Sequence, residues 1–230
     1  SRQYSILCVD DEENVLNSLE RVLKSDGYNV LKATGGEEGL KILEKKQVDL
    51  VISDQRMPQM SGFEFLKIVR EKYPKTVRIM LSGYSDFESL VKTINEGQII
   101  RFLSKPWKNE ELKETIRSVL EQNLVIEQVI EMLNNIQEIV SVAQGIDVKT
   151  TQDNDTIIMK IDMESKEDKK ENIYKFIEYV FKIFKADNKD DINIKSSEVM
   201  REKNTLIFDI NLDKGVILKI IIPTSGKGER

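Results

Sequence analysis

Residues 49–66 read DLVISDQRMPQMSGFEFL, and this stretch decides the fold of the first half of the chain. Residues 48–53 form a short, strongly apolar run, which is typical of a buried strand. Asp54 follows at the carboxyl end of that strand, and residues 62–72 are expected to form a helix that stops before Pro74. The stretch therefore predicts a buried strand, a loop that opens with a carboxylate, and a helix.

Short apolar runs and helical patterns alternate on both sides of this stretch. Strands are expected at residues 4–9, 29–34, 48–53, 76–81 and 99–104, and helices at residues 14–25, 37–46, 62–72, 86–96 and from residue 109 onward. Strands that alternate with helices predict an α/β fold, with a doubly wound parallel sheet of five strands covered on both faces. Ligands bind such sheets at the carboxyl ends of the strands.

Polar side chains follow four of these strands. Asp10 and Asp11 follow the first strand, Asp54 the third, Ser82 the fourth and Lys105 the fifth. Clustered carboxylates repel one another and need a cation, and their oxygens suit Mg²⁺. We expect Asp54 to be a nucleophile that forms an aspartyl phosphate, with Asp10 and Asp11 on the metal. Lys105 and the metal would neutralise the transferring phosphoryl group, and Ser82 would hydrogen-bond to it.

Four motifs carry a resemblance to a known family. They are ILCVDDEENVLNSL at residues 6–19, DLVISDQRMPQMSGFEFL at 49–66, RIMLSGYSDFESLVKTINEG at 78–97 and IIRFLSKPW at 99–107. In this order they resemble the receiver domains of bacterial two-component response regulators, and the likeness covers about residues 4–122. The SDQRMP and RFLSKPW wording is most similar to receivers that are fused to varied output modules. The resemblance implies a flavodoxin-like receiver domain over residues 1–122.

The resemblance also implies a role for each matching residue. Asp54 matches the phospho-acceptor, Lys105 and Ser82 contact the phosphoryl group, and Ser82 and Phe102 match the switch pair. The implied ligands of Mg²⁺ are the carboxylates of Asp10, Asp11 and Asp54 and the backbone carbonyl of Arg56, and Pro106 matches a cis-peptide proline. The implied phosphodonor is a cognate histidine kinase, and no other cofactor is expected.

Two further positions suggest how long the phosphoryl group would last. Arg56 and Tyr84 each lie two residues after a site residue, Asp54 and Ser82 respectively. Bulky side chains there would flank the path of water to Asp54. We therefore expect both to slow hydrolysis.

A long helix is expected over residues 109–145, longer than one small domain can cover. Its seam has heptad spacing, with Leu112, Ile116, Val119, Asn123, Ile126, Ile130 and Leu133. An asparagine in such a seam fixes the register of two-stranded coiled coils, so a parallel homodimer through residues 112–143 is the favoured interpretation. The alternative is a monomer whose helix lies on the second domain.

The remainder of the chain predicts a small α/β domain over residues 150–230. Residues 146–155 are polar and are interpreted as a linker, and residues 164–171 as a charged turn. Strands are expected at residues 156–163, 192–196, 205–212 and 215–223, with a turn at 213–215, and a helix at 172–185. No output enzyme is evident in this domain.

Several functions for this domain stay open. The leading one is a binding or dimerisation module controlled through the long helix. A degenerate histidine-kinase-type ATP-binding fold is a second, since residues 172–185 and 215–223 faintly resemble it, although its Asn-rich helix and Gly-rich lid are missing. An enzyme with Glu178 or Asp209 as base is a third. For the whole chain, the alternative to a phosphorylated switch is a dimeric pseudo-receiver that acts as a scaffold.

Composition excludes several classes. The chain has no histidine, which excludes a phospho-accepting histidine, a histidine-assisted nucleophile and histidine-based metal hydrolases. Its net charge of −5 argues against nucleic-acid binding. No segment reaches the roughly 20 apolar residues that span a bilayer, and no signal peptide opens the chain. Cys8, the only cysteine, is expected to be a buried small hydrophobe. We expect a cytoplasmic protein without membrane contact.

Overall fold

The computed structural model describes residues 3–83, 101–144, 146–163, 180, 194–202 and 205–223. The chain divides into two compact units, Ser1–Leu120 and Glu121–Arg230. Helix α5 (Asn109–Gln144) contributes residues to both of them. Within the described part of the chain, no helix is both long enough and apolar enough to cross a membrane.

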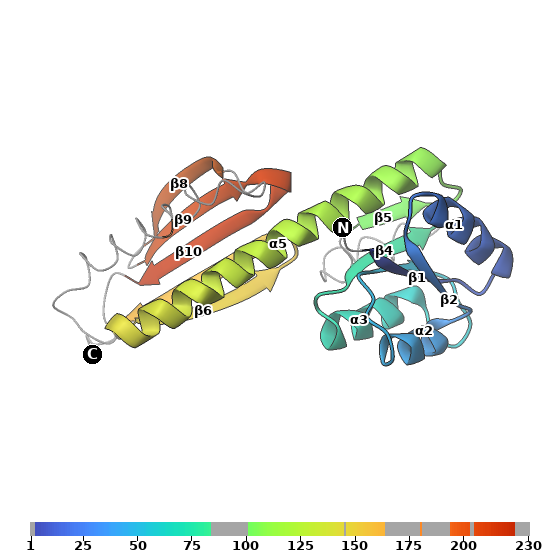
Figure 1. The fold of residues 1–230 in the computed structure, drawn as a ribbon, viewed down its shortest axis with the longest axis horizontal. Helices are drawn as coiled ribbons and strands as arrows, with labels where there is room; N and C mark the ends of the chain where they lie inside the picture. The colour runs from blue at the N-terminus through green and yellow to red at the C-terminus, as the bar shows by residue number, and fades with distance from the viewer. Residues whose placement is uncertain are drawn as a thin grey trace. The chain divides into compact units, whose positions relative to one another are not determined.

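The first unit is built on a five-stranded parallel sheet (Figure 1). Its strands are β1 (Ser5–Val9), β2 (Asn29–Ala33), β3 (Leu50–Asp54), β4 (Val77–Ser82) and β5 (Arg101–Ser104), in the order β2-β1-β3-β4-β5. Helices α1 (Glu13–Ser25), α2 (Gly36–Leu43) and α3 (Gly62–Lys72) connect the first four strands. The expected doubly wound parallel sheet is confirmed, while the helix expected at residues 86–96 lies outside the described residues.

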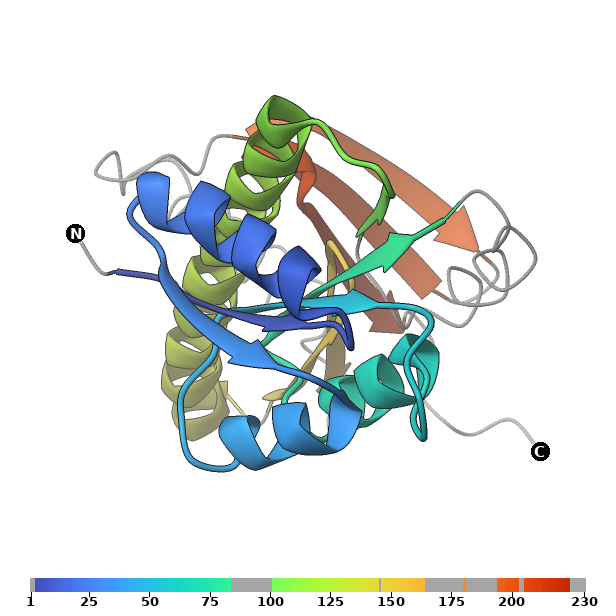
Figure 2. The same cartoon turned by 90° about the vertical axis from the view of Figure 1, so that its right-hand side faces the viewer.

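Both faces of this sheet are covered, as Figure 2 shows with α1 on one side and α2 and α3 on the other. Successive side chains of a strand point to opposite faces. In β1, Ile6 and Cys8 pack with α1 and the start of α5, and Leu7 and Val9 pack with α2 and α3. Cys8 is fully buried, and burial raises the pKa of its thiol to about 12, so it acts as a small hydrophobe as expected.

The second unit is a mixed sheet in the order β6-β7-β10-β9-β8. Its strands are β6 (Ile146–Asp153), β7 (Thr156–Met163), β8 (Ile194–Glu202), β9 (Thr205–Leu212) and β10 (Ile217–Pro223). Strands β7 and β10 pair in parallel, and the other neighbours are antiparallel. A tight turn at Asp213–Gly215 joins β9 to β10, with Lys214 and Gly215 at positive φ. The helix expected at residues 172–185 lies outside the described residues, apart from Val180.

Two boundaries in this unit differ from expectation. The interpretation of residues 146–155 as a linker is wrong, because residues 146–153 form β6 and pair with β7 along their whole length. The strand is polar because it lies at the sheet edge, where Val148 is buried and Lys149 and Thr151 are exposed. Backbone pairing does not need apolar side chains. Strand β8 also runs on to Glu202, well beyond the expected end at residue 196.

The apolar seam of α5 is covered by the chain itself. Leu112, Ile116, Val119 and Leu120 are buried in the core of the first unit. Val125, Ile126, Val129 and Leu133 are buried in the core of the second unit, against its sheet. Side chains that fill these cores are not free to line an intermolecular seam. The coiled-coil interpretation is therefore corrected for residues 112–133, in favour of a helix that packs on its own chain.

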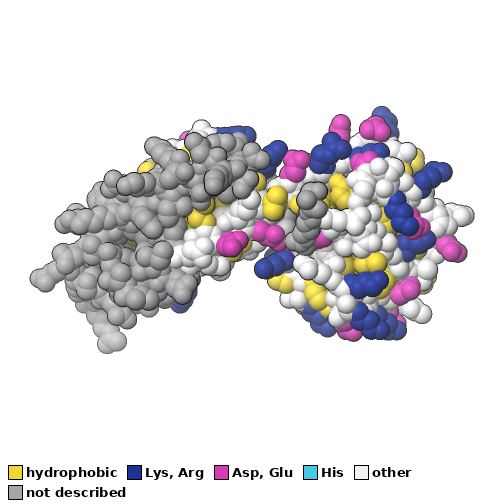
Figure 3. Space-filling model, in the orientation of Figure 1, with side chains coloured by type: hydrophobic (Ala, Val, Ile, Leu, Met, Phe, Trp, Pro, Cys, Tyr) yellow, Lys and Arg dark blue, Asp and Glu magenta, His cyan; other side chains and the backbone are white. Residues whose placement is uncertain are grey.

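Residues of α5 form ion pairs within each unit, and the surface charges are mixed in sign. Asp26, which follows α1, pairs with Lys113 at 2.7 Å and with Arg117 at 3.8 Å. In the second unit, Lys214 pairs with Glu121 at 2.9 Å, although both side chains remain about half exposed. Exposed pairs of this kind contribute little stability. Figure 3 shows basic and acidic side chains interspersed over the visible face of the first unit.

Candidate functional site

Two buried carboxylates lie at the carboxyl ends of neighbouring strands. Asp10 directly follows β1 and is 1% exposed, and Asp54 is the last residue of β3 and is 6% exposed. Strands β1 and β3 pair in parallel, so their ends meet at one edge of the sheet. Ionised carboxylates this deeply buried need a compensating cation.

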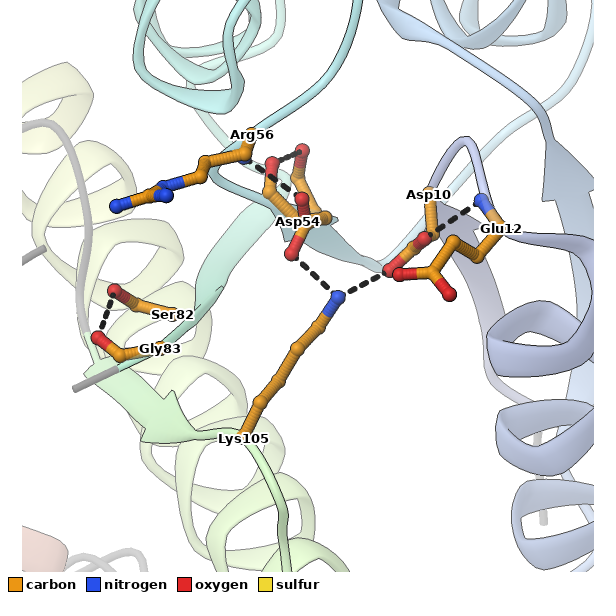
Figure 4. A network of polar contacts seen from close by, with 8 residues as sticks. Asp10, Glu12, Asp54, Arg56, Ser82, Gly83 and Lys105 are labelled. Carbon is orange, nitrogen blue, oxygen red and sulfur yellow. Dashed lines mark hydrogen bonds and ion pairs between the residues drawn. The ribbon is translucent and has the colours of Figure 1, made fainter. Parts of the chain in front are cut away.

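The ammonium group of Lys105 supplies that charge. Its Nζ lies 2.7 Å from Oδ2 of Asp10 and also contacts Oδ1 of Asp54 (Figure 4). Lys105 follows β5, and its backbone N–H donates to the carbonyl of Ser82 at the end of β4, at 2.8 Å. The peptide bond between Lys105 and Pro106 is cis, as the resemblance implies. The structure thus brings Asp10, Asp54 and Lys105 together as expected.

Burial and the ion pair shift the pKa values of both Asp54 and Lys105. Burial raises the pKa of Asp54, and the hydrogen bond and charge of Lys105 offset only part of that rise. For Lys105, burial alone would lower the pKa, but the hydrogen bonds to Asp10 and Asp54 outweigh it and raise the pKa. Lys105 therefore stays protonated, and Asp54 carries a charge that its surroundings solvate incompletely.

Backbone N–H groups orient the two carboxylates. The N–H of Glu12 donates to Oδ1 of Asp10 at 2.9 Å, and the N–H of Arg56 donates to Oδ2 of Asp54 at 2.7 Å. Every oxygen of the two acids is therefore held by a donor. The side-chain pattern did not reveal the donor role of Glu12 or Arg56, because a backbone N–H is present at almost every position. Only the turn geometry shows which one is used.

The hydroxyl of Ser82 is turned away from Asp54, and Phe102 is exposed. Ser82 is 2% exposed, and its hydroxyl donates to the carbonyl of Gly83 at 3.3 Å. Figure 4 shows this hydroxyl apart from the Asp54 carboxylate. Phe102, on β5, is 46% exposed. Ser82 must therefore turn before its hydroxyl could contact a phosphoryl group on Asp54.

Asp11 does not join the two buried acids. It lies at the exposed start of the loop after β1. No three acidic, cysteine or histidine side chains come together as a metal site in the described ranges. The chemistry of the donors still fits Mg²⁺, since Asp10 and Asp54 offer hard oxygens on either side of a positive charge. Of the four expected Mg²⁺ ligands, Asp10 and Asp54 are the two whose carboxylates already lie together.

Gly62 is a site residue whose role the sequence did not reveal. A Cβ atom built on Gly62 would lie 2.0 Å from the backbone oxygen of Asp54. The N–H of Gly62 donates to the carbonyl of Gln55 at 3.0 Å, which closes the loop after β3. Ser61 caps α3, and Glu64 completes a capping box with it. Gly62 is part of the motif at residues 49–66, but only the structure shows that the loop leaves no room for a side chain at this position.

Gly62→Ala is expected to displace the Asp54 loop. Its methyl group would meet backbone atoms, which cannot rotate away, so we expect a loss of about 1–3 kcal/mol in the free energy of unfolding. Urea denaturation measures the loss. Gly35→Ala is the matched control, because nothing lies within 4 Å of its Cβ position. Equal stability of both variants would contradict the close approach.

Comparisons with known proteins agree on the first unit. The family model of the response regulator receiver domain matches residues 6–117. The hydrogenase transcriptional regulatory protein HoxA of Cupriavidus necator is 38% identical over 120 residues, which are 52% of this chain and 25% of HoxA. The transcriptional regulatory protein GlrR of Escherichia coli is 36% identical over 118 residues, which are 51% of this chain and 26% of GlrR.

A solved structure gives the same result. The signal receiver domain of an HD domain-containing protein from Pseudomonas fluorescens is 40% identical, with a TM-score of 0.52, and the match covers 54% of this chain and 99% of that domain. By contrast, the chain spans only about a quarter of the length of the two curated relatives. Receiver domains of this family generally bind Mg²⁺ at their acidic pocket. Residues 6–117 therefore belong to the response regulator receiver domain family.

Proposed function

We propose that Asp54 is the residue that accepts the phosphoryl group. The observation that carries this is a buried carboxylate with Lys105 on one oxygen and the N–H of Arg56 on the other. One carboxylate oxygen attacks the phosphorus atom, the bond to the donor's leaving group breaks, and an aspartyl phosphate results. Incomplete solvation of the Asp54 charge leaves its electron pair available for attack.

The surrounding residues stabilise the transfer. Lys105, already placed between Asp10 and Asp54, neutralises charge on the phosphoryl oxygens. Ser82 turns from the carbonyl of Gly83 to donate to a phosphoryl oxygen. Asp10, Asp11, Asp54 and the carbonyl of Arg56 would hold Mg²⁺, which supplies further charge neutralisation when bound. Asp11 must turn inward to take part.

The output of this switch passes through α5. Ser82 and Phe102 lie on β4 and β5. Their chain neighbours Leu81 and Leu103 pack in one core with Leu112 and Ile116 of α5. We infer that a shift of Ser82 and Phe102 repacks this core and so biases α5, which continues into the second unit. A cytoplasmic histidine kinase would supply the phosphoryl group, and the second unit would bind a protein partner.

Incubation with acetyl phosphate tests the acceptor. Intact-mass analysis in Mg²⁺ is expected to show one added phosphoryl group per chain, and excess EDTA is expected to prevent the addition. No addition in Mg²⁺ would overturn the proposal and favour the pseudo-receiver alternative, in which the chain signals without phosphorylation.

The lifetime of the aspartyl phosphate tests the roles of Arg56 and Tyr84. Arg56 is exposed, and Figure 4 shows its side chain running away from the Asp54 carboxylate, while Tyr84 lies outside the described residues. We expect hydrolysis in an Arg56→Ala, Tyr84→Ala double variant to be faster, on the order of tenfold, or about 1.4 kcal/mol of barrier. Loss of the phosphorylated mass with time gives the rate. An unchanged rate would show that neither side chain shields Asp54.

A further inference from the structure

Strand β8 forms an open edge of the second sheet. It is the last strand in the order β6-β7-β10-β9-β8, and within the described ranges it pairs only with β9 (Figure 1). Every side chain from Lys195 to Glu202 is exposed. Strands of this length that end a sheet present backbone donors and acceptors to any extended segment that can approach.

Two apolar side chains mark the middle of this edge. Val199 is 60% exposed and Met200 is 38% exposed, and as successive residues of a strand they point to opposite faces of the sheet. In the sheet, Val199 lies opposite Phe208 of β9, and Phe208 packs against the core of this unit. Val199 therefore extends the apolar surface of the core to the sheet edge, where nothing among the described residues covers it.

The regular part of the strand is centred on the same residue. The pairing with β9 shifts between Ile194 and Ser196, so the regular ladder runs from Ser196 to Glu202. Its midpoint is Val199. We propose that a second copy of this chain pairs with β8 in antiparallel fashion, about a two-fold axis that passes beside Val199.

The two-fold axis determines which side chains meet. It must stand perpendicular to the sheet, so residues at equal distances on either side of Val199 lie opposite each other. Val199 then faces the partner's Val199, and Glu198 faces the partner's Met200. Ser197 faces the partner's Arg201, and Ser196 faces the partner's Glu202. Each serine hydroxyl can hydrogen-bond to the charged group opposite, and no like charges meet over this ladder.

The neighbouring two-fold registers bring like charges together. Over the same Ser196–Glu202 ladder, an axis beside Glu198 would set that carboxylate against the partner's Glu198. An axis beside Met200 would set Glu198 against the partner's Glu202, twice in the dimer. Like charges directly opposite each other destabilise strand pairing. Charges on an edge strand commonly prevent association, but the pattern here permits one register and penalises those beside it.

Disulfide trapping tests the contact. Opposed Cα atoms in an antiparallel pair lie about 4.5–5.5 Å apart, which suits a disulfide. With diamide as the oxidant, two Val199→Cys thiols are expected to form an intermolecular disulfide, and diamide takes up their two electrons and two protons. Ser197→Cys is the matched control, since its copies would lie four residue steps apart, about 13 Å. Cys8 is fully buried and does not interfere.

A charge exchange at the axis gives a second test. Wild type is expected to sediment as a dimer, and Val199→Lys alone or Val199→Glu alone as a monomer, because each sets like charges face to face. An equal mixture of the two variants is expected to recover the dimer, which occurs only if position 199 faces its own copy. Thr151→Lys, on the opposite sheet edge, should leave the dimer intact.

Three results would overturn the proposal. They are a wild type that stays monomeric at millimolar concentration, a dimer that persists in both Val199 charge variants, and equal disulfide trapping at positions 197 and 199. A monomer that captures a foreign extended peptide on β8 would show that the edge serves another partner. None of these readouts depends on phosphorylation of Asp54, so they stand apart from the outcome with acetyl phosphate.

Discussion

Asp54→Asn is expected to yield a folded protein that takes up no phosphoryl group from acetyl phosphate. Asparagine has nearly the shape of aspartate and can still accept the hydrogen bond from the N–H of Arg56. Its amide lacks the nucleophilic oxygen pair of a carboxylate, so the aspartyl phosphate cannot form. Intact-mass analysis beside wild type measures the loss, and circular dichroism confirms the fold. Phosphoryl addition to the variant would place the acceptor at another residue.

The same substitution has a pH signature. Because burial raises the pKa of Asp54 above its unfolded value of about 3.9, the protonated form is the better tolerated one in the folded state. The stability of wild type should therefore fall as the pH rises from the unfolded pKa through the raised folded pKa. Asp54→Asn lacks this loss, so its free energy of unfolding should rise relative to that of wild type as the pH increases from about 3.9 through the raised pKa of Asp54, as urea denaturation would measure.

Lys105→Met is expected to have the largest effect on stability at neutral pH. The substitution leaves Asp10 and Asp54, at 1% and 6% exposure, without the cation that lies between them. Removing one partner of a buried ion pair costs about 3–5 kcal/mol. Because 22% of the Lys105 side chain is exposed, we expect a loss near 3 kcal/mol, at about the lower end of that range. Urea denaturation at pH 7 measures it.

Two further measurements test whether the stability lost in Lys105→Met comes from the missing positive charge. The raised pKa of Lys105 means that its contribution to wild-type stability is present below the unfolded pKa of about 10.4 and is lost as the pH rises through the folded pKa. The gap between wild type and Lys105→Met should therefore close in alkali, and it should also narrow in acid as Asp54 becomes protonated. Added Mg²⁺ should stabilise the variant more than wild type.

Lys67→Met provides the matched control for this experiment. Lys67 is an exposed residue of α3 and is not one of the residues that surround Asp54, so its substitution should change the free energy of unfolding by less than about 0.5 kcal/mol. A similar loss in both variants would show that the neutral substitution itself, rather than the unpaired acids, lowers stability. A Lys105→Met variant as stable as wild type at pH 7 would contradict the ion-pair argument.

The sequence predicted the receiver fold because its local and global signals agree. The buried strand before Asp54 and the helix after it have periodicities that belong to one secondary structure each, and the parallel sheet follows from their alternation. The same alternation places Asp10, Asp54 and Lys105 at one edge, as the structure confirms. The polar strand β6 was missed, since its pairing with β7 depends on backbone hydrogen bonds that leave little trace in residue type.

The long helix shows where periodicity alone is insufficient. Its heptad spacing is real, but the same spacing suits any helix that packs one face on a core, and the chain supplies two cores of its own to cover it. The sequence therefore determined that α5 has an apolar face, and only the tertiary structure decided what that face touches.

By itself, then, the sequence determined the parallel sheet, the edge at which the chemistry lies and the identity of the acids and the lysine. Tertiary structure decided that Lys105 lies between Asp10 and Asp54, that Asp11 stays exposed, and that Gly62 leaves room for the Asp54 backbone. The physical reason is the distance along the chain over which each feature is determined. Periodicity and strand order are properties of neighbouring residues, whereas contact between side chains far apart in sequence depends on how the whole chain packs.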